Sequence, residues 1–105
     1  MSHAEEEARL REALALHRRG QSDAALAALL ALVAAQPTSP RARVALAFVQ
    51  HATGELTEAA VSCEAALAVA PGFVPALVQL ALVCRDRGEH ARALALHEQV
   101  AALAP

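Results

Sequence analysis

The chain has 105 residues, a length typical of one domain, and 56% of them are apolar although only 2% are aromatic. The formal net charge is −2 with histidine neutral, so no basic excess exists to displace counterions from nucleic acid, and we expect no nucleic-acid partner. The longest alanine- and leucine-rich run, 24–35, has 12 residues, fewer than the roughly 18 of a membrane span, so we expect no membrane association. Three glutamates lie near Met1, where a secretory signal would have a basic segment, so we expect no such signal.

Alanine and leucine supply most of the apolar content, and both favour helices. The sequence therefore predicts one all-α domain over residues 1–105. Cys63 and Cys84 are interpreted as small buried residues of a reducing, cytoplasmic compartment. The alanine, leucine and arginine bias is compatible with a bacterial genome.

Six helices are predicted in chain order, at 3–19, 22–35, 40–53, 56–69, 74–87 and 90–104. Ser2 with Glu5 predicts a capping box at the first of these helices. Ser39 before Pro40 predicts a cap at the third, and Ser22 or Asp23 is expected to cap the second.

Three glycines and three prolines recur at intervals of 34 residues: Gly20, Gly54 and Gly88, and Pro37, Pro71 and Pro105. The whole chain has only four glycines and five prolines, so this agreement identifies an internal repeat. Glycine suits a tight turn because it can adopt positive φ, and proline ends a helix because it lacks the N–H donor.

Four alanine columns repeat in the same register, and we expect them where helices cross closely. They are Ala8, Ala42 and Ala76; Ala13, Ala47 and Ala81; Ala25, Ala59 and Ala93; and Ala34, Ala68 and Ala102.

This 34-residue unit, with its small residues, central glycine and closing proline, resembles the tetratricopeptide repeat (TPR) family. The resemblance implies a right-handed α-solenoid of three helix-turn-helix hairpins, at about 6–39, 40–73 and 74–105, with no C-terminal capping helix. The chain departs from the family at its aromatic positions and at Glu12, where leucine is usual. The aromatic positions hold Arg9, Arg43 and Leu77, and Leu16, Gln50 and Cys84.

In that family the first helix of each hairpin lines a concave side where partners bind. The resemblance places a groove at Leu10, Leu14, His17, Arg18, Arg41, Val44, Phe48, His51, Val78, Leu82 and Arg85. Chaperone-binding members hold a terminal carboxylate with Lys, Asn and Arg, whereas the matching positions here are apolar. We therefore expect an apolar groove with a fringe of arginines, suited to an amphipathic helix or an extended peptide. Phe48 is the candidate anchor, and the alternative is that part of this apolar strip is covered, either within the chain or by another copy.

Histidines and cysteines give no sign of catalysis or metal binding. His17 and His51 occupy equivalent positions, but two ligands are too few for structural zinc. His97 occupies the same position of the 34-residue unit as Leu29 and Cys63, so we expect its side chain to be partly buried. The sequence contains no catalytic triad or phosphate-binding loop, so we expect neither an enzyme nor a cofactor.

The last predicted helix carries apolar residues that a further repeat would cover. They are Leu94, Val100 and Leu103. Two explanations stay open: self-association through this end, or continuation into a longer chain.

The leading interpretation is a non-enzymatic scaffold that binds a partner protein, or another copy of itself, through the apolar groove and the apolar C-terminal end. The alternative is an N-terminal docking or regulatory segment of a larger enzyme, of transferase or oxygenase type. A third alternative is a helical domain that binds a small ligand.

Overall fold

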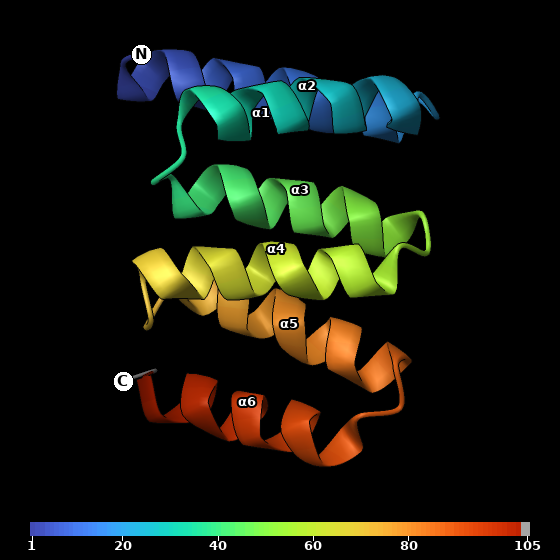
Figure 1. The fold of residues 1–105 in the computed structure, drawn as a ribbon, viewed down its shortest axis with the longest axis vertical. Helices are drawn as coiled ribbons and strands as arrows, with labels where there is room; N and C mark the ends of the chain where they lie inside the picture. The colour runs from blue at the N-terminus through green and yellow to red at the C-terminus, as the bar shows by residue number, and fades with distance from the viewer. Residues whose placement is uncertain (104–105) are drawn as a thin grey trace.

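The computed structural model describes residues 1–103, which form six helices in three antiparallel pairs (Figure 1). The helices are α1 His3–Arg18, α2 Ser22–Ala35, α3 Pro40–Ala52, α4 Leu56–Val69, α5 Val74–Asp86 and α6 His90–Leu103. The described part of the chain contains no strand, so the predicted all-α class and the six predicted helices are confirmed. Pro105, which would close the third repeat, lies outside the described residues. None of the described helices is long and apolar enough to cross a bilayer.

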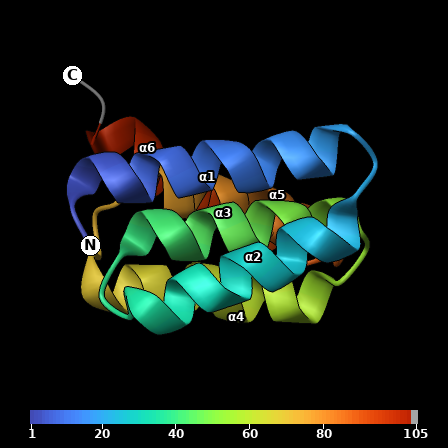
Figure 2. The same ribbon diagram turned by 90° about the horizontal axis from the view of Figure 1, so that it is seen from above.

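The hairpins stack along the longest axis of a body that measures 35 × 27 × 21 Å. Each helix packs against the next helix in the chain. Among the described residues, contacts between helices that are not consecutive join α1 to α3 and α3 to α5. The odd-numbered helices therefore form one continuous wall, while within residues 1–103 α2, α4 and α6 make no contact with one another. Figure 2 shows the stack from above, with α1 in front of α5 and α6.

The three repeated glycines close the turns inside the hairpins. Gly20, Gly54 and Gly88 have φ of 81°, 84° and 81°, in the left-handed region that residues with a side chain avoid. The residue after each glycine donates its backbone N–H to the carbonyl five residues earlier, as Glu55 does to Gln50 at 2.8 Å. This hydrogen bond satisfies a helix-end carbonyl, so the predicted role of these glycines is confirmed.

Two of the three predicted helix caps are present. The Ser2 hydroxyl accepts from the Glu5 N–H at 3.1 Å, and the Ser39 hydroxyl accepts from the Ala42 N–H at 3.2 Å. The prediction for α2 is wrong: Gln21 holds the capping position without a side-chain hydrogen bond. Ser22 lies inside the helix, where its hydroxyl pairs with His17 Nδ1 at 2.8 Å.

Two alanine columns lie between the helices of each pair and are buried throughout: Ala13, Ala47 and Ala81, and Ala25, Ala59 and Ala93. In the column that begins with Ala8, Ala42 and Ala76 are buried, while Ala8 is exposed because no helix precedes α1 in the described chain. The prediction for the fourth column is wrong. Its members, Ala34, Ala68 and Ala102, are exposed near the ends of the even-numbered helices.

The core consists of two clusters that meet in α3. Leu46 and Val49 of α3 pack with α1 and α2, whereas Ala47 packs with α4, α5 and α6. Cys63 and Cys84 are fully buried in the second cluster, as predicted. The buried polar pair Gln50 and Ser62 is satisfied internally, because the Ser62 hydroxyl donates to Gln50 Oε1 at 2.7 Å.

The burial predicted for His97 is wrong. Leu29 and Cys63 in the same column have 0% exposure, and each is followed along the stack by another hairpin. His97 lies on α6, which no further helix covers in the described residues, and its side chain is exposed.

The turn geometry predicts that Gly54→Ala lowers the free energy of unfolding by about 1–2 kcal/mol, because alanine must then adopt the left-handed conformation. Urea denaturation would measure the loss. Gly72→Ala is the matched control, because Gly72 lacks positive φ and an added Cβ there would meet no atom within 4 Å. Equal effects of the two substitutions would contradict the conformational explanation.

Candidate functional site

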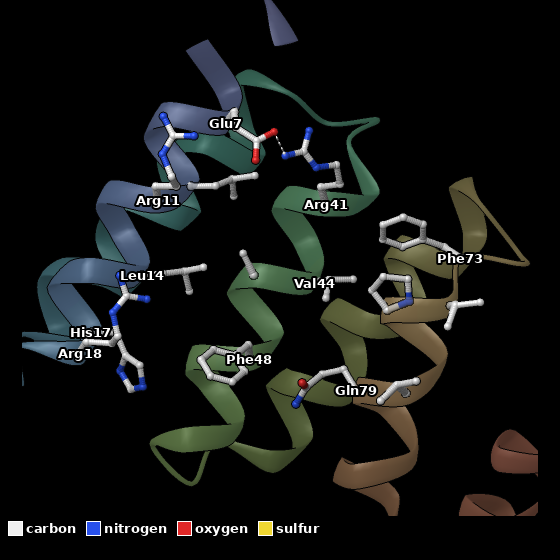
Figure 3. Close-up of a pocket in the computed structure, with 15 residues that line it drawn as sticks. Glu7, Arg11, Leu14, His17, Arg18, Arg41, Val44, Phe48, Phe73 and Gln79 are labelled. Carbon is white, nitrogen blue, oxygen red and sulfur yellow. Dashed lines mark hydrogen bonds and ion pairs between the residues drawn. The ribbon is translucent and has the colours of Figure 1, made fainter. Parts of the chain in front are cut away.

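The concave side of the stack holds a groove of about 1170 Å³ between α1, α3 and α5 (Figure 3). Its walls come from the odd-numbered helices and from Phe73, the residue that precedes α5. The lining residues are Glu7, Leu10, Arg11, Leu14, His17, Arg18, Arg41, Val44, Ala45, Phe48, Phe73, Val74, Pro75, Val78 and Gln79.

Most of the residues predicted for the groove lie together in it. They are Leu10, Leu14, His17, Arg18, Arg41, Val44, Phe48 and Val78. The remaining predicted residues, His51, Leu82 and Arg85, do not line it.

Phe48 lies on the wall formed by α3 and leaves 46% of its surface exposed (Figure 3). Its ring meets the His17 ring edge to face, with centroids 5.8 Å apart. On the opposite wall Val74 and Val78 are 39% and 38% exposed. These side chains leave apolar surface on both sides of an open groove, so they are not part of the closed core.

Sequence reasoning missed the end of the groove formed at the start of α5. Phe73, Val74 and Pro75 line the groove, although the sequence places Phe73 between two predicted helices and indicates no binding role for Val74 and Pro75 at the start of the predicted helix 74–87. It also missed residues on the faces already identified. Glu7 and Arg11 lie on the same helix face as Leu14 and Arg18. Extending the helical spacing of that face toward the N-terminus would have identified them.

The charges of the groove are distributed unevenly. Arg41 on α3 is neutralised by Glu7 on α1, with 2.5 Å between the guanidinium nitrogen and the carboxylate oxygen. Arg11 and Arg18 also line the groove from α1. Within residues 1–103, neither of these two has a carboxylate at ion-pair distance. The α1 wall therefore carries uncompensated positive charge, while the α5 wall is largely apolar.

His51 is held beside the groove by two hydrogen bonds. The Gln79 amide donates to His51 Nδ1 at 2.9 Å, and His51 Nε2 lies 2.6 Å from Asp86 Oδ2. Because Gln79 donates to Nδ1, the proton of the neutral ring lies on Nε2 and points to Asp86. This hydrogen bond, and a second from Arg85, hold the pKa of Asp86 below its usual value. His51 and Arg85 thus act in a local polar network.

The three residues predicted for the exposed end differ in burial. Leu94 and Leu103 are 59% and 49% exposed, whereas Val100 is partly buried against the core. The unpaired apolar surface of α6 is therefore concentrated at Leu94 and Leu103.

Neither cysteine has the environment of a nucleophile. Burial, with smaller contributions from Cys84 and Glu64, raises the pKa of Cys63 to about 12. Burial also raises the pKa of Cys84. Both thiols stay protonated near neutral pH, and thiolate is the reactive form. In the described residues, no three histidine, cysteine or acidic side chains are grouped as metal ligands.

Comparison with known proteins identifies the fold but no sequence family. No protein-family model and no curated protein matches the chain. Among solved structures, MamA superimposes with a TM-score of 0.84 at 24% identity, over 95% of this chain and 58% of that one. The Sgt2 TPR domain from Aspergillus fumigatus gives 0.85 at 23% identity, over 91% and 64%.

A third structure matches over nearly its whole length. The second TPR domain of Spaghetti (RPAP3), bound to the HSP90 peptide SRMEEVD, gives a TM-score of 0.86 at 15% identity, over 94% of this chain and 92% of that one. The chain thus spans less than two thirds of MamA and of the Sgt2 domain, but almost all of the RPAP3 domain. At these identities the matches establish the fold.

The raised thiol pKa values predict that the free energy of unfolding falls as pH rises above about 9. The unfolded Cys63 loses its proton near its ordinary pKa of 9.0, whereas the folded one keeps it to about 12, so proton loss favours the unfolded chain. The chain has no tyrosine and all nine of its basic residues are arginine, so few other groups titrate in this range.

Urea denaturation between pH 8 and 11 would measure this effect, and Cys63→Ala should reduce the slope because one of the two buried thiols is removed. Identical slopes for the original chain and Cys63→Ala would show that ionisation of Cys63 has no part in alkaline destabilisation.

Proposed function

Because the chain has the tetratricopeptide-repeat fold of three hairpins, we propose that it is a protein-interaction scaffold whose concave groove binds an apolar segment of a partner protein. The observation that carries this proposal is the exposure of Phe48, which lines the open groove and has 46% of its surface exposed. A large aromatic side chain on a concave wall is the kind of residue that supplies most of the energy of an interface.

The dimensions of the groove favour a peptide over a small molecule. Its volume of about 1170 Å³ exceeds the range of about 300–1,000 Å³ that is usual for small-ligand pockets. It extends across three helices and is open along its length. An amphipathic helix, or an extended segment with alternating apolar side chains, would cover Phe48, Val44 and Val78 together.

Structural neighbours support a peptide-binding role for this fold. The matched RPAP3 domain is bound to an HSP90 peptide, and a TPR domain of yeast Sti1 is matched in complex with pHsp70. The positions that the TPR resemblance assigns to carboxylate binding are apolar in this chain: Leu10, Leu14, Val44, Phe48, Val78 and Leu82. We therefore propose an apolar partner segment in place of a terminal carboxylate.

The uneven charge also orients the partner. Arg11 and Arg18 present positive charge along α1, and the opposite wall at Phe73 and Val74 presents apolar surface. An amphipathic helix with acidic residues along one edge would place that edge against α1. A basic edge would meet the two arginines and be disfavoured.

Two synthetic helical peptides with the same apolar face, one with glutamate and one with lysine along the flanking edge, test this proposal by calorimetric titration. The glutamate peptide should bind more tightly. Phe48→Ala should weaken its binding by about tenfold or more, since central aromatic anchors contribute over 1 kcal/mol. Circular dichroism should show unchanged helicity, because Phe48 lies outside both core clusters.

Matched controls separate the groove from the rest of the surface. Val61→Ala removes an apolar side chain that is 62% exposed on α4, away from the groove, and should leave binding unchanged. Arg18→Glu should reduce the preference for the glutamate peptide, whereas Arg19→Glu, which does not line the groove, should have a smaller effect. Peptide affinities that are unchanged by both Phe48→Ala and Arg18→Glu would contradict the proposal.

A further inference from the structure

Successive hairpins pack together in one fixed register. The second helix of one hairpin contacts the first helix of the next, α2 with α3 and α4 with α5. Leu29 of α2 and Leu46 of α3 lie buried in the same core cluster, and Cys63 of α4 and Leu80 of α5 occupy the same positions in the other cluster. These two positions of the 34-residue unit are therefore buried in the same core cluster at both internal interfaces.

The ends of the stack carry the same two positions without a partner. One 34-residue step after Cys63 is His97 on α6, and one step before Leu46 is Glu12 on α1. Both side chains are exposed, although their interior equivalents are between 0% and 5% exposed. The two positions that are apolar at the internal interfaces thus hold polar residues at the ends of the stack: a histidine at the α6 end and a glutamate at the α1 end.

From this register we propose that a second copy of the chain stacks on the first head to tail, as a fourth hairpin would, with Glu12 of one copy facing His97 of the other. A neutral imidazole can donate an N–H to the Glu12 carboxylate, and a protonated one adds charge attraction. The pair therefore replaces the apolar contact of the internal interfaces with a polar one between copies.

The shapes of the two ends agree with this arrangement. The α1 end has a shallow recess of about 270 Å³, lined by Arg9, Glu12, Ala13, Leu16, Ala28 and Ala31. The α6 end projects Leu94, which is 59% exposed, whereas its equivalent Ala60 is 2% exposed inside the stack. Leu94 is adjacent to His97 on the helix face that continues the stack, so both would enter the recess together and bury apolar surface.

Nearby charges on α6 do not oppose the pairing. Glu98 is the only acidic residue beside His97 in sequence, and its equivalents Leu30 and Glu64 remain exposed at the internal interfaces. Arg92 is one repeat after Glu58, and Glu58 is likewise exposed at the internal interface. In the same register both charges lie outside the contact between copies.

The arrangement also determines how assembly proceeds. The two contacting surfaces are different, so every added copy leaves a free end of each kind, and such an interface forms open chains rather than closed dimers. A dimer formed by two α6 ends would instead stop at two copies.

Light scattering of the chain of residues 1–105 at protein concentrations up to about 1 mM tests the proposal. High concentrations are needed because contacts that bury less than about 1,200 Å² are weak. We expect the average mass to rise steadily with concentration and to pass that of a dimer. A monomer at every concentration, or a plateau at two copies, would overturn the proposal.

Three variants test the residue pair itself. His97→Glu places a carboxylate against Glu12 and should lower the association constant about tenfold or more, because like charges in an interface are costly. The double variant His97→Glu with Glu12→Lys restores opposite charges between copies and should recover association. Ala95→Glu adds the same charge on α6 at a position that is exposed in every repeat, and should have little effect. Equal loss in Ala95→Glu and His97→Glu, or no recovery in the double variant, would also overturn it.

Discussion

The close approach of the two helices within each hairpin is the constraint on which the rest of the structure depends. We attribute it to six alanines, two in each hairpin, that are buried in the core clusters: Ala13 and Ala25, Ala47 and Ala59, and Ala81 and Ala93. None of them is more than 5% exposed. A larger side chain would separate the helices, because core volume is fixed to within about one methylene group. The glycine turns then return the chain without strain, and each hairpin becomes a flat unit that can stack.

Stacking of such units places the first helix of every hairpin on the same side. The contacts of α1 with α3 and of α3 with α5 hold these helices in one wall, which leaves Phe48, Val74 and Val78 exposed in a groove. The same stacking leaves unlike surfaces at the two ends. The proposals for the groove and for the ends therefore follow from one packing rule, although each rests on different side chains and can fail alone.

The helices could be predicted from the sequence because their limits are set locally. Glycine and proline recur in register, and Ser2 and Ser39 cap helices through hydrogen bonds within three residues. Other features could not be predicted because they depend on distant parts of the chain. His97 is exposed because no helix covers α6 in the described residues. Phe73 lines the groove from the position just before α5, where the repeat pattern predicts no binding residue. His51 is held by Gln79 and Asp86, which the spacing of repeats does not reveal.

The most direct test of the packing rule is the free energy of unfolding of Ala59→Leu beside that of Ala68→Leu, both on α4. Ala59 is 0% exposed at the contact with α3, so the larger side chain should cost about 1–3 kcal/mol by forcing the helices apart. Ala68 is exposed on the same helix, and its substitution should change stability by no more than about 0.5 kcal/mol. Equal effects of the two substitutions would contradict the claim that close alanine contacts set the spacing of the helices.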